Sequence, residues 1–132
     1  MGLTRSFDEA EVLARAAAAF VSTGFEGTSV DDLVAATGLF RGSLYKAFGS
    51  KRGLFLAALG AAETRDVLTD DDLDLLLVAL LDVAPTDDVA RESCRTMLGR
   101  LPGGDPATTV GTRLVQRAGL AHPRTGRARR TA

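Results

Sequence analysis

Arg41, Ser43 and Lys46 place three hydrogen-bond donors within six residues of one another, in a stretch without acidic side chains. The stretch, residues 38–55, reads GLFRGSLYKAFGSKRGLF, and no aspartate or glutamate occurs from position 33 to position 62. Arginine and lysine can donate to guanine O6 and N7, and serine can bond a base or a phosphate. These residue types in this pattern favour binding to a nucleic acid.

The same stretch meets the steric needs of a helix that enters the major groove of DNA. Such a helix needs short side chains at its start, where Gly42 would let the backbone approach closely. Tyr45 and Lys51 suit contacts to phosphate, as does the start of a preceding helix at Thr28. Two alternatives stay open: Tyr45 could be a half-buried residue with a hydrated hydroxyl, and Lys51 with Arg52 could form a solvated first helical turn.

The formal net charge of −1 conceals a strong segregation of charge along the chain. Residues 1–55 carry six bases and six acids, residues 56–92 carry two and ten, and residues 93–132 carry eight and one. The three sums of 0, −8 and +7 recover −1. Because screening limits the reach of a charge to roughly 8–10 Å, the local acid-free stretch decides what binds there, whatever the total charge.

The spacing of apolar residues predicts an all-α protein. Ser6 is expected to cap the first helix, Thr28 or Ser29 the second, Ser50 the fourth and Thr86 the sixth. Helix two, a glycine-containing turn and helix three have the layout of a helix-turn-helix. The expected helices span residues 7–23, 29–37, 41–48, 51–62, 70–84, 87–101 and, as a short one, 112–118.

The stretch GTSVDDLVAATGLFRGSLYKAFGSKRGLFLAAL resembles the DNA-binding domain of the tetracycline-repressor (TetR) family of bacterial transcription regulators, over residues 8–60. The resemblance implies an all-α helix-turn-helix protein that binds double-stranded DNA. It also implies a homodimer on a palindromic operator, and repression that a small-molecule effector releases. The motif consists of Thr28, Gly38, Gly42, Leu44, Tyr45, Phe48, Ser50 and Lys51. The implied base contacts come from Arg41, Gly42, Ser43 and Lys46, and the implied backbone contacts from Thr28, Tyr45 and Lys51.

Phe40 departs from the family pattern, which has a small polar residue at that position. A favourable N-cap of the third helix, worth about 1 kcal/mol, is therefore missing. The ring could pack under the turn or touch a thymine methyl group, and we favour packing.

The resemblance divides the chain into a helix-turn-helix domain over 1–52, a short helical regulatory or dimerisation region over 53–120 and a disordered basic tail over 121–132. The leucine stripe from Leu73 to Leu81 could line a pocket, support a dimer or close the core. Family members carry a larger second domain, so an alternative function is a truncated interaction module. Such a module would keep the DNA-binding head but lack a working ligand or dimer domain.

No residue pattern indicates catalysis, a metal site or a cofactor. Asp70, Asp71 and Asp72 are read as acids at a helix start, Cys94 as a buried small hydrophobe, and His122 as a residue without catalytic partners. LPGGDPATT lacks the GK[ST] ending of a phosphate-binding loop. With neither an export signal nor a membrane span in the sequence, we expect a cytoplasmic protein without membrane association.

Overall fold

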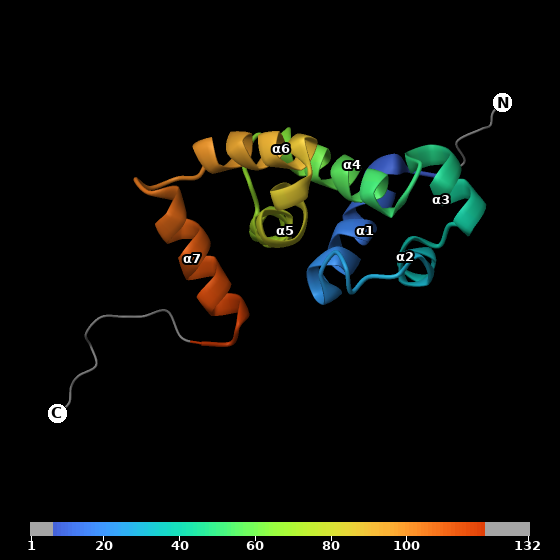
Figure 1. Cartoon of the computed structure of the whole chain (residues 1–132), viewed down its shortest axis with the longest axis horizontal. Coiled ribbons are helices and arrows are strands. Elements are labelled where there is room, and N and C mark those ends of the chain that lie inside the picture. The colour runs from blue at the N-terminus through green and yellow to red at the C-terminus, as the bar shows by residue number, and fades with distance from the viewer. Residues whose placement is uncertain (1–6, 121–132) are drawn as a thin grey trace.

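The computed structural model describes residues 7–120, and every regular element within that range is helical. The all-α prediction is therefore confirmed. Figure 1 shows α3 at one end of the molecule and α7 at the other, with α4 and α6 running along one side between them. The α-helices are α1 (Glu9–Thr23), α2 (Val30–Thr37), α3 (Arg41–Phe48), α4 (Lys51–Glu63), α5 (Asp70–Val78), α6 (Asp88–Gly99) and α7 (Pro106–Arg117).

Local signals set the ends of the helices around the predicted turn. Ser29 and Asp32 form a capping box at the start of α2, and Ser50 accepts a hydrogen bond from the backbone N–H of Gly53 at the start of α4. Gly38 ends α2 in the left-handed conformation, with φ of 76°, which glycine adopts without a steric penalty. The predicted bounds of α3 are confirmed at both ends.

Three other predicted helix starts were wrong. Asp8 caps α1, whereas the expected cap, Ser6, lies outside the described residues. Asp87 caps α6 in place of Thr86, because its carboxylate accepts from the N–H of Ala90. Asp105 caps α7, which therefore starts six residues before the predicted Thr112. Proline at the first helical position favours that earlier start. Backbone N–H groups at this position have no partner within a helix, so the lack of one in proline costs no hydrogen bond.

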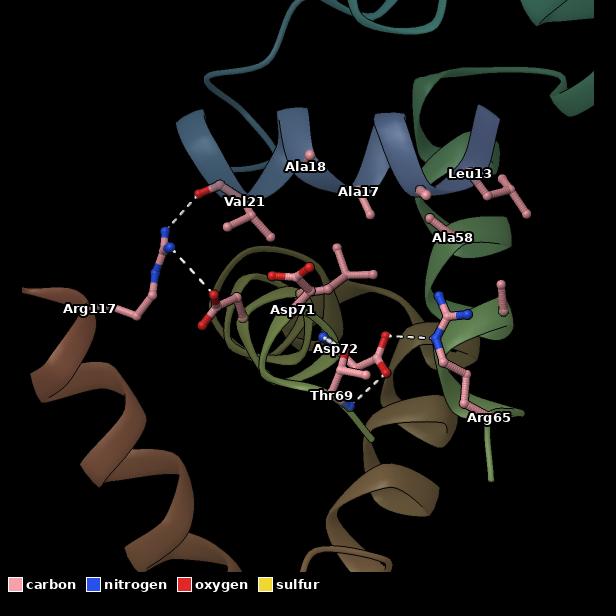
Figure 2. Close-up of a pocket in the computed structure, with 14 residues that line it drawn as sticks. Leu13, Ala17, Ala18, Val21, Ala58, Arg65, Thr69, Asp71, Asp72 and Arg117 are labelled. Atoms are coloured by element: carbon pink, nitrogen blue, oxygen red, sulfur yellow. Dashed lines mark hydrogen bonds and ion pairs between the residues drawn. The ribbon is translucent and has the colours of Figure 1, made fainter. Parts of the chain in front are cut away.

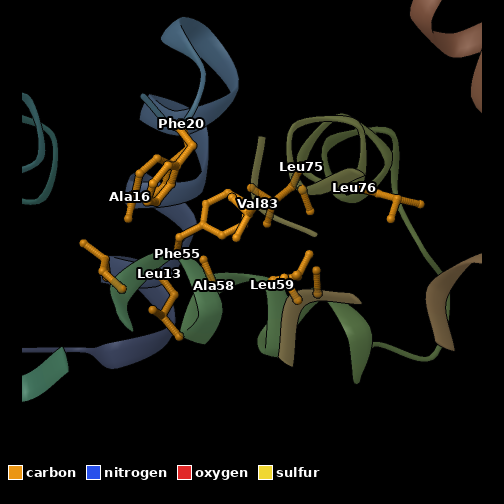
Figure 3. Packing of buried hydrophobic residues seen from close by; sticks show 14 of the residues in the cluster. Leu13, Ala16, Phe20, Phe55, Ala58, Leu59, Leu75, Leu76 and Val83 are labelled. Atoms are coloured by element: carbon orange, nitrogen blue, oxygen red, sulfur yellow. The ribbon is translucent and has the colours of Figure 1, made fainter. Parts of the chain in front are cut away.

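Phe55 of α4 lies at the centre of the core. Its ring packs edge-on against those of Phe20 and Phe25, with centroids 5.0 Å and 5.4 Å away. Figure 3 shows Phe55 between Phe20 of α1 and Val83, which follows α5. All three phenylalanines and Val83 are buried, so one apolar cluster joins the N-terminal helices to the second half of the chain.

Only part of the leucine stripe from Leu73 to Leu81 closes the core. The α-helix α5 gives way at Ala79–Val83 to η1, a π-helical segment, and then to a short 3-10 turn, η2 (Ala84–Thr86). The wider hydrogen-bonding pattern of a π-helix changes which side chains share a face. Leu81 is 77% exposed, so the end of the leucine stripe does not close the core. The buried apolar residues of this stretch are Leu75, Leu76, Ala79 and Val83.

Polar contacts also join the two halves of the chain. Asp82 accepts a hydrogen bond of 2.9 Å from the backbone N–H of Phe25, in the connection between α1 and α2. Arg52, in the first turn of α4, forms an ion pair with Asp87 at 3.3 Å. None of the described helices combines the length and the apolar character that crossing a membrane requires.

Candidate nucleic-acid interface

Two buried leucines hold α2 and α3 together as a helix-turn-helix. Leu33 of α2 is 1% exposed and Leu44 of α3 is 5% exposed, and both belong to the core cluster. Thr37 stabilises the turn, because its hydroxyl donates to the carbonyl of Leu33 at 2.7 Å and accepts from the N–H of Leu39 at 3.2 Å. These contacts fix the angle at which α3 leaves the turn.

Helix α3 leaves nearly its whole surface available to a partner. Leu44 is its one buried residue. Arg41, Gly42, Ser43 and Lys46 are all exposed, and Tyr45 is 42% exposed. The structure thus brings together the four predicted base-contacting residues on an exposed helix at the end of the molecule (Figure 1).

Arg41 forms an ion pair with Asp31 in the first turn of α2. The two side chains are 52% and 84% exposed, and ion pairs in such settings contribute about 0–1 kcal/mol. DNA can therefore compete for the guanidinium group at little cost. The neighbouring acid, Asp32, accepts from the backbone N–H of Ser29, which lowers its pKa and keeps it ionised as the capping partner.

Gly42 has no structural reason to be glycine within the fold. A Cβ atom at this position would meet nothing within 4 Å, and the backbone φ is not positive. Replacing Gly42 by alanine should raise the free energy of unfolding by up to about 1 kcal/mol, because glycine is a poor helix former. We expect the same variant to bind DNA more weakly, since the added methyl group keeps the helix start away from the groove.

Gly60→Ala in α4 is the matched control for this prediction. Its Cβ also would meet nothing within 4 Å, and α4 is not the exposed helix of the motif. Urea denaturation and fluorescence anisotropy with labelled DNA should report higher stability for both variants and weaker binding for Gly42→Ala alone. Unchanged DNA affinity of Gly42→Ala would contradict the role assigned to Gly42.

Thr28 does not present its side chain to solvent. The residue is fully buried, and its hydroxyl donates to the carbonyl of Gly24 at 2.6 Å and lies 2.5 Å from the hydroxyl of Thr23. The phosphate contact predicted at the start of α2 would therefore come from backbone groups and not from this hydroxyl, and it stays a prediction. The hydroxyl instead satisfies a backbone carbonyl in the connection between α1 and α2.

Lys51 makes contacts within the domain, and its role as a phosphate ligand stays a prediction. Its ammonium group donates to the carbonyls of Phe25 and Thr28, at 2.9 Å and 3.0 Å, and lies 4.6 Å from the centre of the Phe25 ring. Arg52 lies over the same ring at 5.4 Å. The alternative of a solvated first turn is wrong. Sequence reasoning missed these contacts because backbone carbonyls carry no residue signature.

The aromatic residues beside the exposed face lie where DNA could reach them. Tyr45 borders a small hollow with Leu33 and Lys51, so one side of its ring packs while the other remains exposed. The side chain of Phe40 makes no capping hydrogen bond and the residue is 82% exposed, so packing under the turn was the wrong choice. Leu39, the residue before it, is partly buried and packs against the core.

Within residues 7–120, the second half of the chain brings no cluster of metal-binding side chains to this surface. Cys94 is buried, and desolvation raises the pKa of its thiol to about 11, which confirms the reading as a small hydrophobe. Among residues 7–120, no three His, Cys, Asp or Glu side chains lie close enough together to hold a metal ion. His122 lies outside that range.

Comparisons with known proteins place the match on the same helices. Residues 12–58 match the family described as bacterial regulatory proteins, tetR family. An uncharacterized HTH-type transcriptional regulator of Bacillus subtilis (strain 168), YezE, is 49% identical over 59 residues. The match spans 45% of this chain but only 30% of the length of that relative. No solved structure matches the chain with comparable significance.

Proposed function

We propose that this chain, whose residues 12–58 match the bacterial regulatory proteins of the tetR family, is a member of that family that binds DNA sequence-specifically and represses transcription. The operator is a palindrome bound by a homodimer. A small-molecule effector releases the protein from it. The regulatory region is the predicted segment 53–120.

The exposed surface of α3 carries this proposal. Leu44 and, in part, Phe48 pack α3 against the core, whereas Arg41, Ser43 and Lys46 are exposed. A helix with these exposed donors is suited to contact a partner outside the domain. Because no acidic residue occurs from position 33 to position 62, an anionic partner would meet little repulsion there. The size and spacing of these side chains suit the donor and acceptor pattern of the major groove.

A dimer follows from the amount of sequence that one such helix can read. A single helix-turn-helix contacts one half-site, and dimers place two of them about 34–36 Å apart or a multiple of that spacing. Leu81 of η1 and Leu114 of α7 are 77% and 55% exposed, which offers apolar surface in the second half of the chain for this purpose. A dimer interface that includes these residues is part of the proposal.

The test is selection of bound sequences from a random DNA pool with the full chain, followed by anisotropy titrations at several salt concentrations and light scattering of the complex. We expect an inverted repeat, affinity that falls with salt, and two chains per site. DNA binding by a monomer without sequence preference would favour the alternative of a truncated module with an intact head.

Arg41→Ala tests the division between base and backbone contacts. Loss of a bidentate pair with guanine should cost about 1–3 kcal/mol at one base pair and relax the preference there. Arg95→Ala is the control, because Arg95 also forms an exposed ion pair, with Glu92 in α6. If Arg41→Ala weakened specific and non-specific binding equally in the titrations, Arg41 would be a phosphate contact.

A further inference from the structure

A pocket of about 380 Å³ opens between α1, α4, α5 and α7. It lies on the side of α1 that faces the second half of the chain. Its volume lies within the range of about 300–1,000 Å³ that is usual for small-molecule sites. Figure 2 shows α1 above the pocket, α4 beside it, α5 below it and Arg117 of α7 at its edge. None of the DNA-facing residues of α3 lines it.

Small apolar side chains create the space and form most of the wall. Ala17 of α1 and Ala58 and Ala61 of α4 contribute single methyl groups, between the larger side chains of Leu13 and Leu75. A body packed against these residues would lose contact with water on several sides, and burial of apolar area is the main source of affinity in such sites. The wall therefore suits an apolar molecular body.

Most of the charged groups at the rim are already paired. Arg65 donates to Asp72 at 3.0 Å, and Arg117 donates to the carbonyl of Val21 at 3.0 Å and lies 3.5 Å from Asp74 (Figure 2). The guanidinium group of Arg113 also bonds both oxygens of Asp74. Because these cations already have carboxylate partners, the rim has little to offer an anionic ligand.

Asp71 differs from the other carboxylates of the rim. Among the described residues, it makes no hydrogen bond or ion pair, although Figure 2 shows it on α5 beneath α1, between Arg117 and Arg65. The lining holds two cations and three carboxylates, and Arg113 beside it pairs with Asp74, so the charges of the rim balance. Asp71 is exposed, and its charge acts on Arg113 only through space. Of the three carboxylates of the lining, Asp71 is the one that no guanidinium group hydrogen-bonds, at the edge of an apolar wall.

We propose that this pocket binds a small organic cation, with its apolar body on the alanine-rich wall and its ammonium group paired with Asp71. The role of this cation as the effector of a DNA-binding regulator rests on the function proposed above. Binding to the pocket is measured without DNA, so the two proposals fail separately.

The experiment compares three probes of the same shape and different charge by calorimetry with the full chain. These are 1-naphthylmethylammonium, 1-naphthylmethanol and 1-naphthoate. We expect the cation to bind at least about tenfold more tightly than the alcohol, a difference of about 1.4 kcal/mol, and the carboxylate to bind most weakly. Equal affinity for the cation and the alcohol, or no binding of any probe at millimolar concentration, would overturn the proposal.

Two variants locate the binding. Asp71→Asn should weaken the cation about tenfold and leave the alcohol unchanged, because only the charged pair is lost. Ala17→Leu should weaken all three probes by filling the pocket. Asp88→Asn is the control, since Asp88 is likewise an acid in the first turn of a helix but lies outside the pocket lining. Unchanged cation binding to Asp71→Asn would contradict the pairing.

An occupant from within the chain is the competing outcome. The segment 121–132 follows α7 and contains Arg124, Arg127, Arg129 and Arg130. If deletion of this segment raised the affinity of the cationic probe about tenfold or more, those arginines would be the natural partners of Asp71, and the proposal of a small-molecule ligand would be wrong.

Discussion

Phe55→Ala is expected to lower the free energy of unfolding by about 3–5 kcal/mol, the usual cost of removing a buried aromatic ring. Phe55 is fully buried and contacts two other rings edge-on, a geometry that stabilises the fold beyond the burial of apolar area. Because small domains have only about 5–15 kcal/mol of stability, the variant should be close to unfolding. Urea denaturation followed by circular dichroism measures the change.

Phe40→Ala is the control for this result. The Phe40 ring is 82% exposed, so its loss should change stability by less than about 0.5 kcal/mol. It would, however, change DNA affinity if the ring reaches a thymine methyl. A loss of stability under about 1 kcal/mol for Phe55→Ala would mean that the three rings do not form the centre of the core.

Lys51→Met should lower the free energy of unfolding by about 1.5–3 kcal/mol, as expected when hydrogen bonds to a charged group are lost. Methionine keeps most of the stem of the side chain against Phe25 but cannot donate to the carbonyls of Phe25 and Thr28. Measured well below the melting temperature, DNA binding by this variant should keep the salt dependence of the wild type.

Lys46→Met is the matched comparison. Lys46 is exposed and makes no ion pair within the part of the chain that the structure describes. Its loss should leave stability unchanged and reduce the slope of log affinity against log salt by about one unit, the signature of a phosphate or base contact. If Lys51→Met reduced the slope while stability stayed constant, the original assignment of Lys51 to phosphate would be correct.

The helix-turn-helix was predictable because its signals are local. Ser29 and Asp32, three residues apart, cap the start of α2, and Gly38 ends that helix. Ser50 caps the start of α4. Each of these boundaries depends on residues within one helical turn. Leu33 and Leu44 follow from the apolar spacing. The same local information was enough to place Arg41 to Lys46 on one exposed helix.

The contacts that the sequence did not predict have a different cause, which is packing between separate parts of the chain. Carbonyl groups in the connection between α1 and α2 accept hydrogen bonds from Thr28 and Lys51, and the residue types alone do not reveal this. Leu81 fits a regular helical stripe, but η1 shifts the register. Neither backbone partners nor a π-helical turn leaves a pattern in the residue types.

The bond between Asp82 and the N–H of Phe25 has a consequence for synthesis. The two residues are 57 positions apart, and a ribosome adds about 5–20 residues per second. Asp82 is therefore made roughly 3–11 s after Phe25, a delay obtained by dividing 57 by those rates. Val83, which packs with Phe55, is made just after Asp82.

During that interval α1 and α2 can form, but the carboxylate partner of their connection has not yet been made. Part of the core that surrounds Phe55 is also still missing. A nascent chain would thus acquire its nucleic-acid-binding geometry only once translation has passed η1.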